Sequence, residues 1–184
     1  MAQSTMPVAV EVPMSWAQFL APPTDVRAEY ADGKALVTPP PSFAHQEVCQ
    51  RLRDVLKRTL GTTAVVAVGV GWRLPGDALR LRIPDVMLLA EPPSEDVVTA
   101  APLVVFEVLS SNRTDNLVRK STEYLDAGAS HYWVVDPRDR VIDVLARGRG
   151  GWRRLARITD ETPHAAVPIP QFGTVTLSLA EILA

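Results

Sequence analysis

The stretch APLVVFEVLSSNRTDNLVRKSTEYL, residues 101–125, places charged side chains where buried elements are expected. Its first half contains LVVFEVL, an almost wholly apolar run that is typical of a central strand covered on both faces. Glu107 stands in the middle of this run. A carboxylate there needs a cation, a metal ion or strong hydrogen-bond donors, or it becomes protonated. Glu107 is therefore a candidate functional residue, and a buried ion pair with Lys120 is the alternative interpretation.

The second half of the stretch predicts a helix that starts at Asp115 and ends at Gly128. At 100° per residue, an apolar arc of about 120° contains Leu117, Val118, Ser121, Tyr124 and Leu125. Arg119 and Glu123 fall on the opposite side of the helix. Lys120 lies on the flank of the arc, so its long stem either lies along the sheet to reach a site or extends to solvent without a function.

Asp85 supplies a second acid near the same place. It follows Pro84 at the start of VMLLA, where a strand enters the core. Neighbouring strands lie about 4.8 Å apart, so Asp85 and Glu107 can share one divalent cation if their strands are adjacent. Such a cation, Mg²⁺ or its substitute Mn²⁺, polarises a phosphodiester and lowers the pKa of a bound water. Lys120 can orient or deprotonate that water, or stabilise the charge that builds up on phosphorus.

The rest of the chain predicts a mixed α/β fold in which one long helix precedes a crowded set of strands. The expected elements are a hairpin at Asp32–Gly33, a helix over 42–61, a strand–turn–strand over 63–90, strands at 130–136, 140–146 and 151–158, and a helix at 178–184. Residues 1–25 are proline-rich and are expected to form an N-terminal arm, with one domain over 26–184.

Composition excludes several classes of protein. The single cysteine, Cys49, excludes an internal disulfide, and its helical spacing from neighbouring apolar residues favours a buried structural thiol. The three histidines, His45, His131 and His164, lack the spacing of paired metal ligands. No apolar run approaches a membrane span and no leader is visible, so we expect a soluble cytoplasmic protein. The net charge of −2 argues against extensive nucleic-acid binding.

The order of motifs resembles that of the Uma2 family. The matching segments are RIPDV (82–86), PLVVFEVLS (102–110), a helix with Lys120 and Tyr124, Gly128 and HYWVVDP (131–137). EYADG (29–33) and PPPSFAHQEV (39–48) resemble the N-terminal hairpin and the proline-rich helix entry of the family. The resemblance covers roughly residues 25–180 and implies the restriction endonuclease-like PD-(D/E)xK fold, a central mixed β-sheet flanked by helices.

The resemblance also implies roles for individual residues. Asp85 and Glu107 match the metal ligands, and both are implied to be catalytic together with Lys120. The general signature places its lysine two residues after the acid, where this chain has Leu109, so the resemblance implies that the lysine has moved to the helix.

Two further positions match polar residues near the family's site. Glu29 is a candidate accessory metal ligand, directly or through water, and His45 is a candidate phosphate contact.

The expected function is a Mg²⁺-dependent endonuclease that hydrolyses DNA phosphodiester bonds. Arg80, Arg82 and Arg113 are candidate DNA contacts, with Arg119 as a further local cation. A single domain that cuts both strands often works as a homodimer, which is one expected assembly. The alternatives are a catalytically inactive binding or regulatory module with the nuclease fold, or a hydrolase of a smaller phosphoester.

Overall fold

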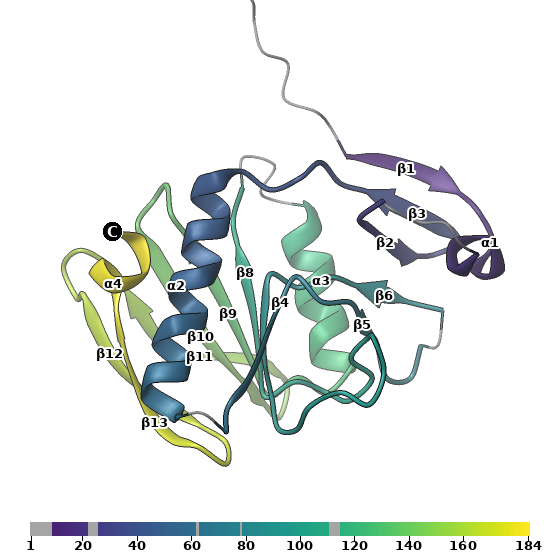
Figure 1. The fold of residues 1–184 in the computed structure, drawn as a ribbon. Helices are drawn as coiled ribbons and strands as arrows, with labels where there is room; N and C mark the ends of the chain where they lie inside the picture. The colour runs from purple at the N-terminus through teal and green to yellow at the C-terminus, as the bar shows by residue number, and fades with distance from the viewer. Residues whose placement is uncertain (1–8, 22–25, 62, 78, 111–114) are drawn as a thin grey trace, which may run out of the picture.

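A six-stranded mixed sheet lies at the centre of the computed structural model, which describes residues 9–21, 26–61, 63–77, 79–110 and 115–184 (Figure 1). Its strands are β4 (Val65–Val68), β7 (Val86–Leu89), β8 (Val104–Val108), β9 (His131–Asp136), β10 (Val141–Gly148) and β11 (Gly151–Ile158). Their order is β11-β10-β9-β8-β7-β4, with β8 and β9 parallel and the other neighbours antiparallel. The prediction of a central mixed sheet is confirmed.

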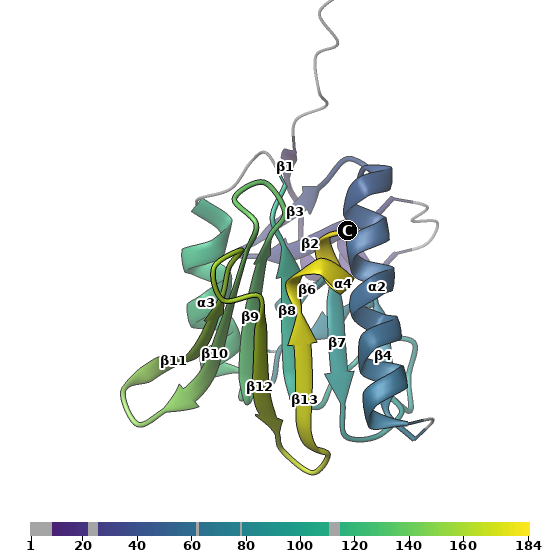
Figure 2. The same cartoon turned by 90° about the vertical axis from the view of Figure 1, so that its left-hand side faces the viewer.

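Two helices cover opposite faces of this sheet (Figures 1 and 2). Helix α2 (Phe43–Leu60) begins at Ser42, whose hydroxyl accepts the N–H of His45, and ends at Gly61, as the sequence predicts. Helix α3 (Asp115–Asp126) packs on the other face, where the Tyr124 ring contacts the rings of Trp72 and Tyr132. Each face of β8 therefore points into a separate apolar core.

Additional elements extend the α2 side of the sheet. They are the hairpin β12 (His164–Ile169) and β13 (Gly173–Ser178) and the helix α4 (Leu179–Leu183). The C-terminal helix is predicted by the sequence, whereas the hairpin is not. No helix among the described residues is long and apolar enough to cross a membrane.

A second, five-stranded antiparallel sheet lies beside α3. Its strands, in the order β1-β3-β2-β6-β5, are β1 (Val10–Pro13), β3 (Lys34–Val37), β2 (Ala28–Ala31), β6 (Leu81–Arg82) and β5 (Trp72–Arg73). The predicted hairpin is the β2–β3 turn, where Asp32 and Gly33 both have positive φ, at 54° and 76°. The described part of the expected N-terminal arm adds β1 to the edge of this sheet, followed by the short helix α1 (Trp16–Leu20).

Residues 63–90 depart from the expected strand–turn–strand. They form four short strands, of which β4 and β7 belong to the central sheet and β5 and β6 to the second sheet. The segment therefore connects the two sheets instead of forming one hairpin.

A buried ion pair joins the second sheet to α3. Arg82 of β6 is 1% exposed, and its Nε and Nη2 donate to the two oxygens of Glu123 at 2.6 and 2.7 Å. Its Nη1 donates to Glu29 Oε2 of β2 at 3.1 Å. One guanidinium thus links β2, β6 and α3, and removal of Glu123 takes away its two shortest hydrogen bonds in the interior.

Glu123→Ala should destabilise the fold by about 3–5 kcal/mol, because it leaves the buried Arg82 guanidinium without its two-point partner. The measurement is urea unfolding at neutral pH. Asp126→Ala, on the exposed side of the same helix, is the control and should shift the unfolding free energy by no more than about 0.5 kcal/mol. Equal effects of the two substitutions would contradict the structural role of this ion pair.

Candidate active site

A cavity of about 880 Å³ opens where the start of α2, the ends of β7 and β8, helix α3 and the β2–β3 hairpin meet. The five residues singled out as catalytic or accessory from the sequence all line it, namely Glu29, His45, Asp85, Glu107 and Lys120. They come from five different segments, so only the folded chain brings them together.

The two acids lie on neighbouring antiparallel strands. Val86 of β7 pairs with Phe106 of β8, and continuing this register by one residue places Asp85 opposite Glu107. Residues opposite each other in an antiparallel pair have Cα atoms about 4.5–5.5 Å apart and project to the same face. The Val108 N–H donates to Asp85 Oδ2 at 2.8 Å and holds this carboxylate at the end of the sheet. This placement allows the two carboxylates to share a divalent cation.

Glu107 is buried and held by two donors. The Tyr124 hydroxyl donates to Glu107 Oε1 at 2.7 Å, and Lys120 Nζ donates to the same oxygen at 3.3 Å. Burial raises the pKa of the Glu107 carboxyl to about 7; Lys120 opposes this rise, and the nearby carboxylates of Asp85 and Glu29 add to it. The carboxyl therefore holds its proton to a higher pH than an ordinary glutamate, and a nearby cation would favour its ionised form.

Lys120 lies between two carboxylates. Its Nζ is 2.9 Å from Glu29 Oε1 as well as 3.3 Å from Glu107 Oε1, and its side chain is 13% exposed. Burial alone would lower the pKa of the ammonium, but Glu107 and Glu29 outweigh burial and raise it above its ordinary value. Lys120 is therefore a fixed positive charge. It forms the ion pair with Glu107 that the alternative interpretation expects, and it also lines the cavity and contacts Glu29.

Glu29 holds Lys120 in place. Its Oε1 also accepts the Ile83 N–H at 3.1 Å, and its Oε2 accepts from Arg82. Burial would raise the pKa of Glu29, but Lys120 and Arg82 lower it, so the group remains ionised. Both oxygens already have partners, and this geometry favours a role in positioning Lys120.

His45 reaches the site from the first turn of α2. Its Nε2 lies 3.2 Å from Asp85 Oδ2, and its Nδ1 lies 3.6 Å from Cys49 Sγ. Burial alone would lower the pKa of His45, but the contacts with Asp85 and Cys49 raise it to about 10. The imidazolium thus balances the charge of Asp85 at neutral pH.

The buried face of α3 differs from the predicted arc. Val118, expected inside the arc, is 72% exposed, whereas Glu123, expected on the opposite side, is buried. The buried face is turned toward Lys120, which lies between Glu123 and Tyr124 around the helix. The periodicity of apolar residues missed this face because two of its members, Lys120 and Glu123, are charged. Their ion-pair partners lie on strands that are distant in the sequence.

Two of the candidate DNA-contacting arginines have structural partners instead. Arg82 is buried against Glu123 and Glu29, so the phosphate contact expected of it is not available. Arg80 makes ion pairs with Asp32, Asp77 and Glu123, and its charge is likewise compensated. Arg113 lies outside the described residues.

Other cations do line the cavity. Arg27 and Arg51 were not singled out from the sequence, where nothing distinguishes them from other arginines.

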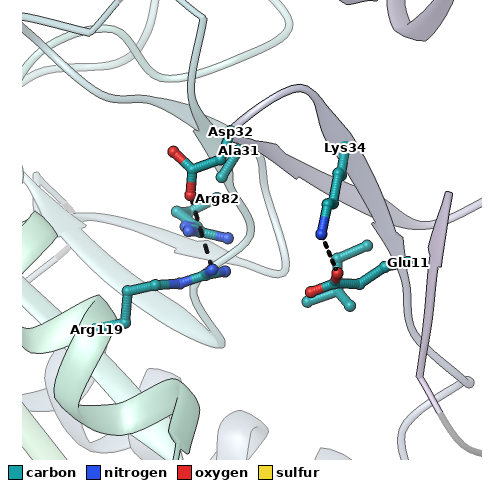
Figure 3. Close-up of a pocket in the computed structure, with 7 residues that line it drawn as sticks. Glu11, Ala31, Asp32, Lys34, Arg82 and Arg119 are labelled. Carbon is teal, nitrogen blue, oxygen red and sulfur yellow. Dashed lines mark hydrogen bonds and ion pairs between the residues drawn. The ribbon is translucent and has the colours of Figure 1, made fainter. Parts of the chain in front are cut away.

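A second, small pocket of about 60 Å³ lies between the β2–β3 hairpin and α3 (Figure 3). Its charged residues all have partners: Lys34 lies 2.8 Å from Glu11, Arg119 lies 3.8 Å from Asp32, and Arg82 pairs with Glu123 and Glu29. The pocket has the volume of about two water molecules, so it is unsuited to a nucleotide.

A mixed sheet flanked by helices, with two acids opposite each other on neighbouring strands, defines a restriction endonuclease-like fold. Residues 16–180 match the family model of Uma2, described as "Putative restriction endonuclease". The chain belongs to the Uma2 family.

Comparison with solved structures confirms the fold. A protein from Anabaena variabilis ATCC 29413, described as "a putative nuclease belonging to DUF820", superposes with a TM-score of 0.72. The superposition covers 93% of this chain and 98% of the other at 20% identity. None of the curated proteins compared with the chain matches it.

Glu107→Gln should change how stability depends on pH. The folded-state pKa of about 7 lies above the ordinary value of 4.5, so the metal-free protein should lose stability through this residue as pH rises from about 5 to about 7. The glutamine variant lacks this titration, so its free energy of unfolding should rise by up to about 3 kcal/mol relative to that of the wild type over that window. Lys120 keeps Glu29 as a partner in the variant, so no unpaired ammonium offsets the gain.

The measurement is urea unfolding in the presence of a chelator at about pH 5 and about pH 8. Glu95→Gln, at an exposed position, is the control and should have the wild-type free energy of unfolding at both pH values. If the free energies of unfolding of the wild type and Glu107→Gln change by the same amount between the two pH values, Glu107 does not titrate in this range.

Proposed function

We propose that the protein is a divalent-metal-dependent endonuclease that hydrolyses DNA phosphodiester bonds. The observation that carries the proposal is the placement of Asp85 opposite Glu107, with the Lys120 ammonium 3.3 Å from Glu107, in one large cavity. Membership of the Uma2 family supports the same reaction class.

The donor set fits a hard divalent cation. Carboxylate oxygens are the ligands that Mg²⁺ prefers, and a buried acid with a raised pKa gains from a nearby cation. Asp85 and Glu107 would hold the ion, for which Mn²⁺ is a substitute. When bound, the ion would polarise the phosphodiester and lower the pKa of an attacking water.

Each neighbouring residue has a defined role in the proposal. Lys120 stays protonated and stabilises the negative charge that develops on the phosphoryl oxygens; its raised pKa disfavours a role as general base. Tyr124 orients Glu107 through its hydroxyl, and the Val108 N–H orients Asp85. Glu29 holds the Lys120 ammonium beside Glu107 at the cavity wall.

Substrate affinity is proposed to come from few cations. The net charge is −2, and Arg80 and Arg82 are compensated by close carboxylates, so Arg27 and Arg51 at the cavity wall are the candidate phosphate contacts; the pair of Arg51 with Glu47 is longer, at 3.8 Å, and solvent-exposed. The expected homodimeric assembly and cytoplasmic location remain predictions.

The decisive test compares plasmid cleavage and metal binding in matched variants. Lys120→Met keeps an apolar stem and removes the charge, so it should lower the cleavage rate by about 10²–10³-fold at saturating metal while Mn²⁺ still binds in calorimetry. Asp85→Ala should lose both cleavage and Mn²⁺ binding. Arg119→Ala, at the neighbouring and more exposed position, should keep the wild-type rate.

Circular dichroism and a melting curve establish that each variant is folded. Mn²⁺ binding without cleavage by the wild type, on either plasmid or single-stranded substrates, would overturn the nuclease proposal. It would instead favour the catalytically inactive binding module.

Arg27→Ala and Arg51→Ala should each weaken DNA binding and reduce the slope of log affinity against log salt by about one. Fluorescence anisotropy with a labelled duplex, measured across a salt series, gives both quantities. Arg153→Ala, on the exposed surface of β11, should change neither. Binding that is insensitive to salt would exclude a phosphate-contacting cavity wall.

A further inference from the structure

Asp85, one of the two proposed catalytic acids, also belongs to a second donor set of a different chemical kind. Ligand atoms of His45, Cys49 and Asp85 all lie within 4.8 Å of one another. His45 and Cys49 are four residues apart on α2, so both project from the same face of the helix toward the end of β7. The histidines alone lack a metal-binding spacing, but histidine and cysteine together have one.

The distances suit a tetrahedral centre. Zinc binds thiolate sulfur at about 2.3 Å and imidazole nitrogen at about 2.0–2.1 Å, so tetrahedral angles separate these two ligand atoms by about 3.5 Å. The observed distance from Cys49 Sγ to His45 Nδ1 is 3.6 Å. Asp85 Oδ2 lies 3.2 Å from the other ring nitrogen, Nε2, and the three ligand atoms lie within 4.8 Å of one another, so rotations of the His45 and Asp85 side chains would bring the carboxylate onto the same ion as the third protein ligand.

The chemistry and access of the cluster also favour zinc. Thiolate and imidazole select soft or borderline cations such as Zn²⁺, whereas the carboxylate pair of Asp85 and Glu107 suits Mg²⁺. Cys49 is buried in the core, but His45 and Asp85 line the large cavity, so an ion can enter from that side and keep a water as its fourth ligand.

We infer that His45, Cys49 and Asp85 form a Zn²⁺ site that shares Asp85 with the Mg²⁺ site, so that bound zinc inhibits the enzyme. Zinc displaces the thiol proton of Cys49 and any proton on His45, as metals do at such ligands. The inhibition rests on the proposed nuclease function, whereas the zinc site itself does not.

Cobalt substitution tests the site without reference to activity. The chain has one cysteine, so a thiolate-to-cobalt charge-transfer band in the near ultraviolet can come only from Cys49. Titration of the folded wild type with Co²⁺ should produce this band at one ion per chain, and Zn²⁺ should abolish it by displacement. Absence of the band at saturating Co²⁺ would overturn the proposal.

Variants locate the remaining ligands. His45→Ala should weaken Zn²⁺ binding at least tenfold in calorimetry, and His164→Ala, on the exposed hairpin strand β12, should not change it. Glu107→Gln should keep the cobalt band, because Glu107 belongs to the carboxylate pair alone. An unchanged zinc affinity in His45→Ala, or loss of the band in Glu107→Gln, would refute this ligand set.

A kinetic measurement then tests the shared ligand. Zn²⁺ should inhibit Mg²⁺-supported cleavage by the wild type, and Cys49→Ser should need at least tenfold more Zn²⁺ for half inhibition. If the cobalt band forms but no Mg²⁺-dependent cleavage exists, the nuclease proposal fails and the zinc site stands. If cleavage occurs and is equally sensitive to Zn²⁺ in both proteins, the shared-ligand proposal fails and the nuclease proposal stands.

Discussion

Glu29 is held between two buried cations, and the geometry of the whole site depends on this arrangement. Its Oε2 accepts a hydrogen bond from Arg82, which also forms an ion pair with Glu123 of α3. Its Oε1 forms an ion pair with Lys120 of the same helix. The second sheet is thereby fixed against α3, and the Lys120 ammonium is fixed beside Glu107. A buried charge that loses its partner costs several kcal/mol, so the arrangement tolerates little displacement. Structural ion pairs and candidate catalytic groups thus form one connected network.

The same network explains why an acidic protein can carry the site of a nuclease. Carboxylates at the end of a sheet repel one another, and burial increases that repulsion. Lys120 offsets part of this at Glu107, but burial first, and then the carboxylates of Asp85 and Glu29, keep the pKa of this acid raised, so more positive charge is needed to hold it ionised. A divalent cation between Glu107 and Asp85 would supply the missing charge. The arginines that stabilise the interior are, for the same reason, not available to bind DNA phosphates.

Local signals predicted those parts of the fold that depend on neighbouring residues. Ser42 and Gly61 mark the ends of α2, and the Asp32–Gly33 pair marks the β2–β3 turn, because caps and tight turns are determined by a few adjacent residues. The buried face of α3 could not be predicted in this way, since the partner of Glu123 lies 41 residues earlier in the chain. The β12–β13 hairpin was missed as well; its first strand contains a proline at 168, which weakens the usual strand pattern. The cavity cations and the Cys49 contact likewise become visible only when distant segments are in place.

The position of the lysine shows why spacing in the sequence is an incomplete guide to such a site. A lysine two residues after Glu107 would project from β8 on the same face as the acid, because side chains alternate along a strand. Leu109 occupies that position, and its N–H continues the pairing with β9 by donating to Val135. Helix α3 packs on this same face, so Lys120 can reach Glu107 from the helix instead of from the strand. The proposed chemistry requires an ammonium beside the acid and the phosphate, and either route would satisfy that requirement. A fixed-spacing motif would therefore miss the proposed site in this chain, whereas the distance of 3.3 Å between the Lys120 ammonium and the Glu107 carboxylate points to it.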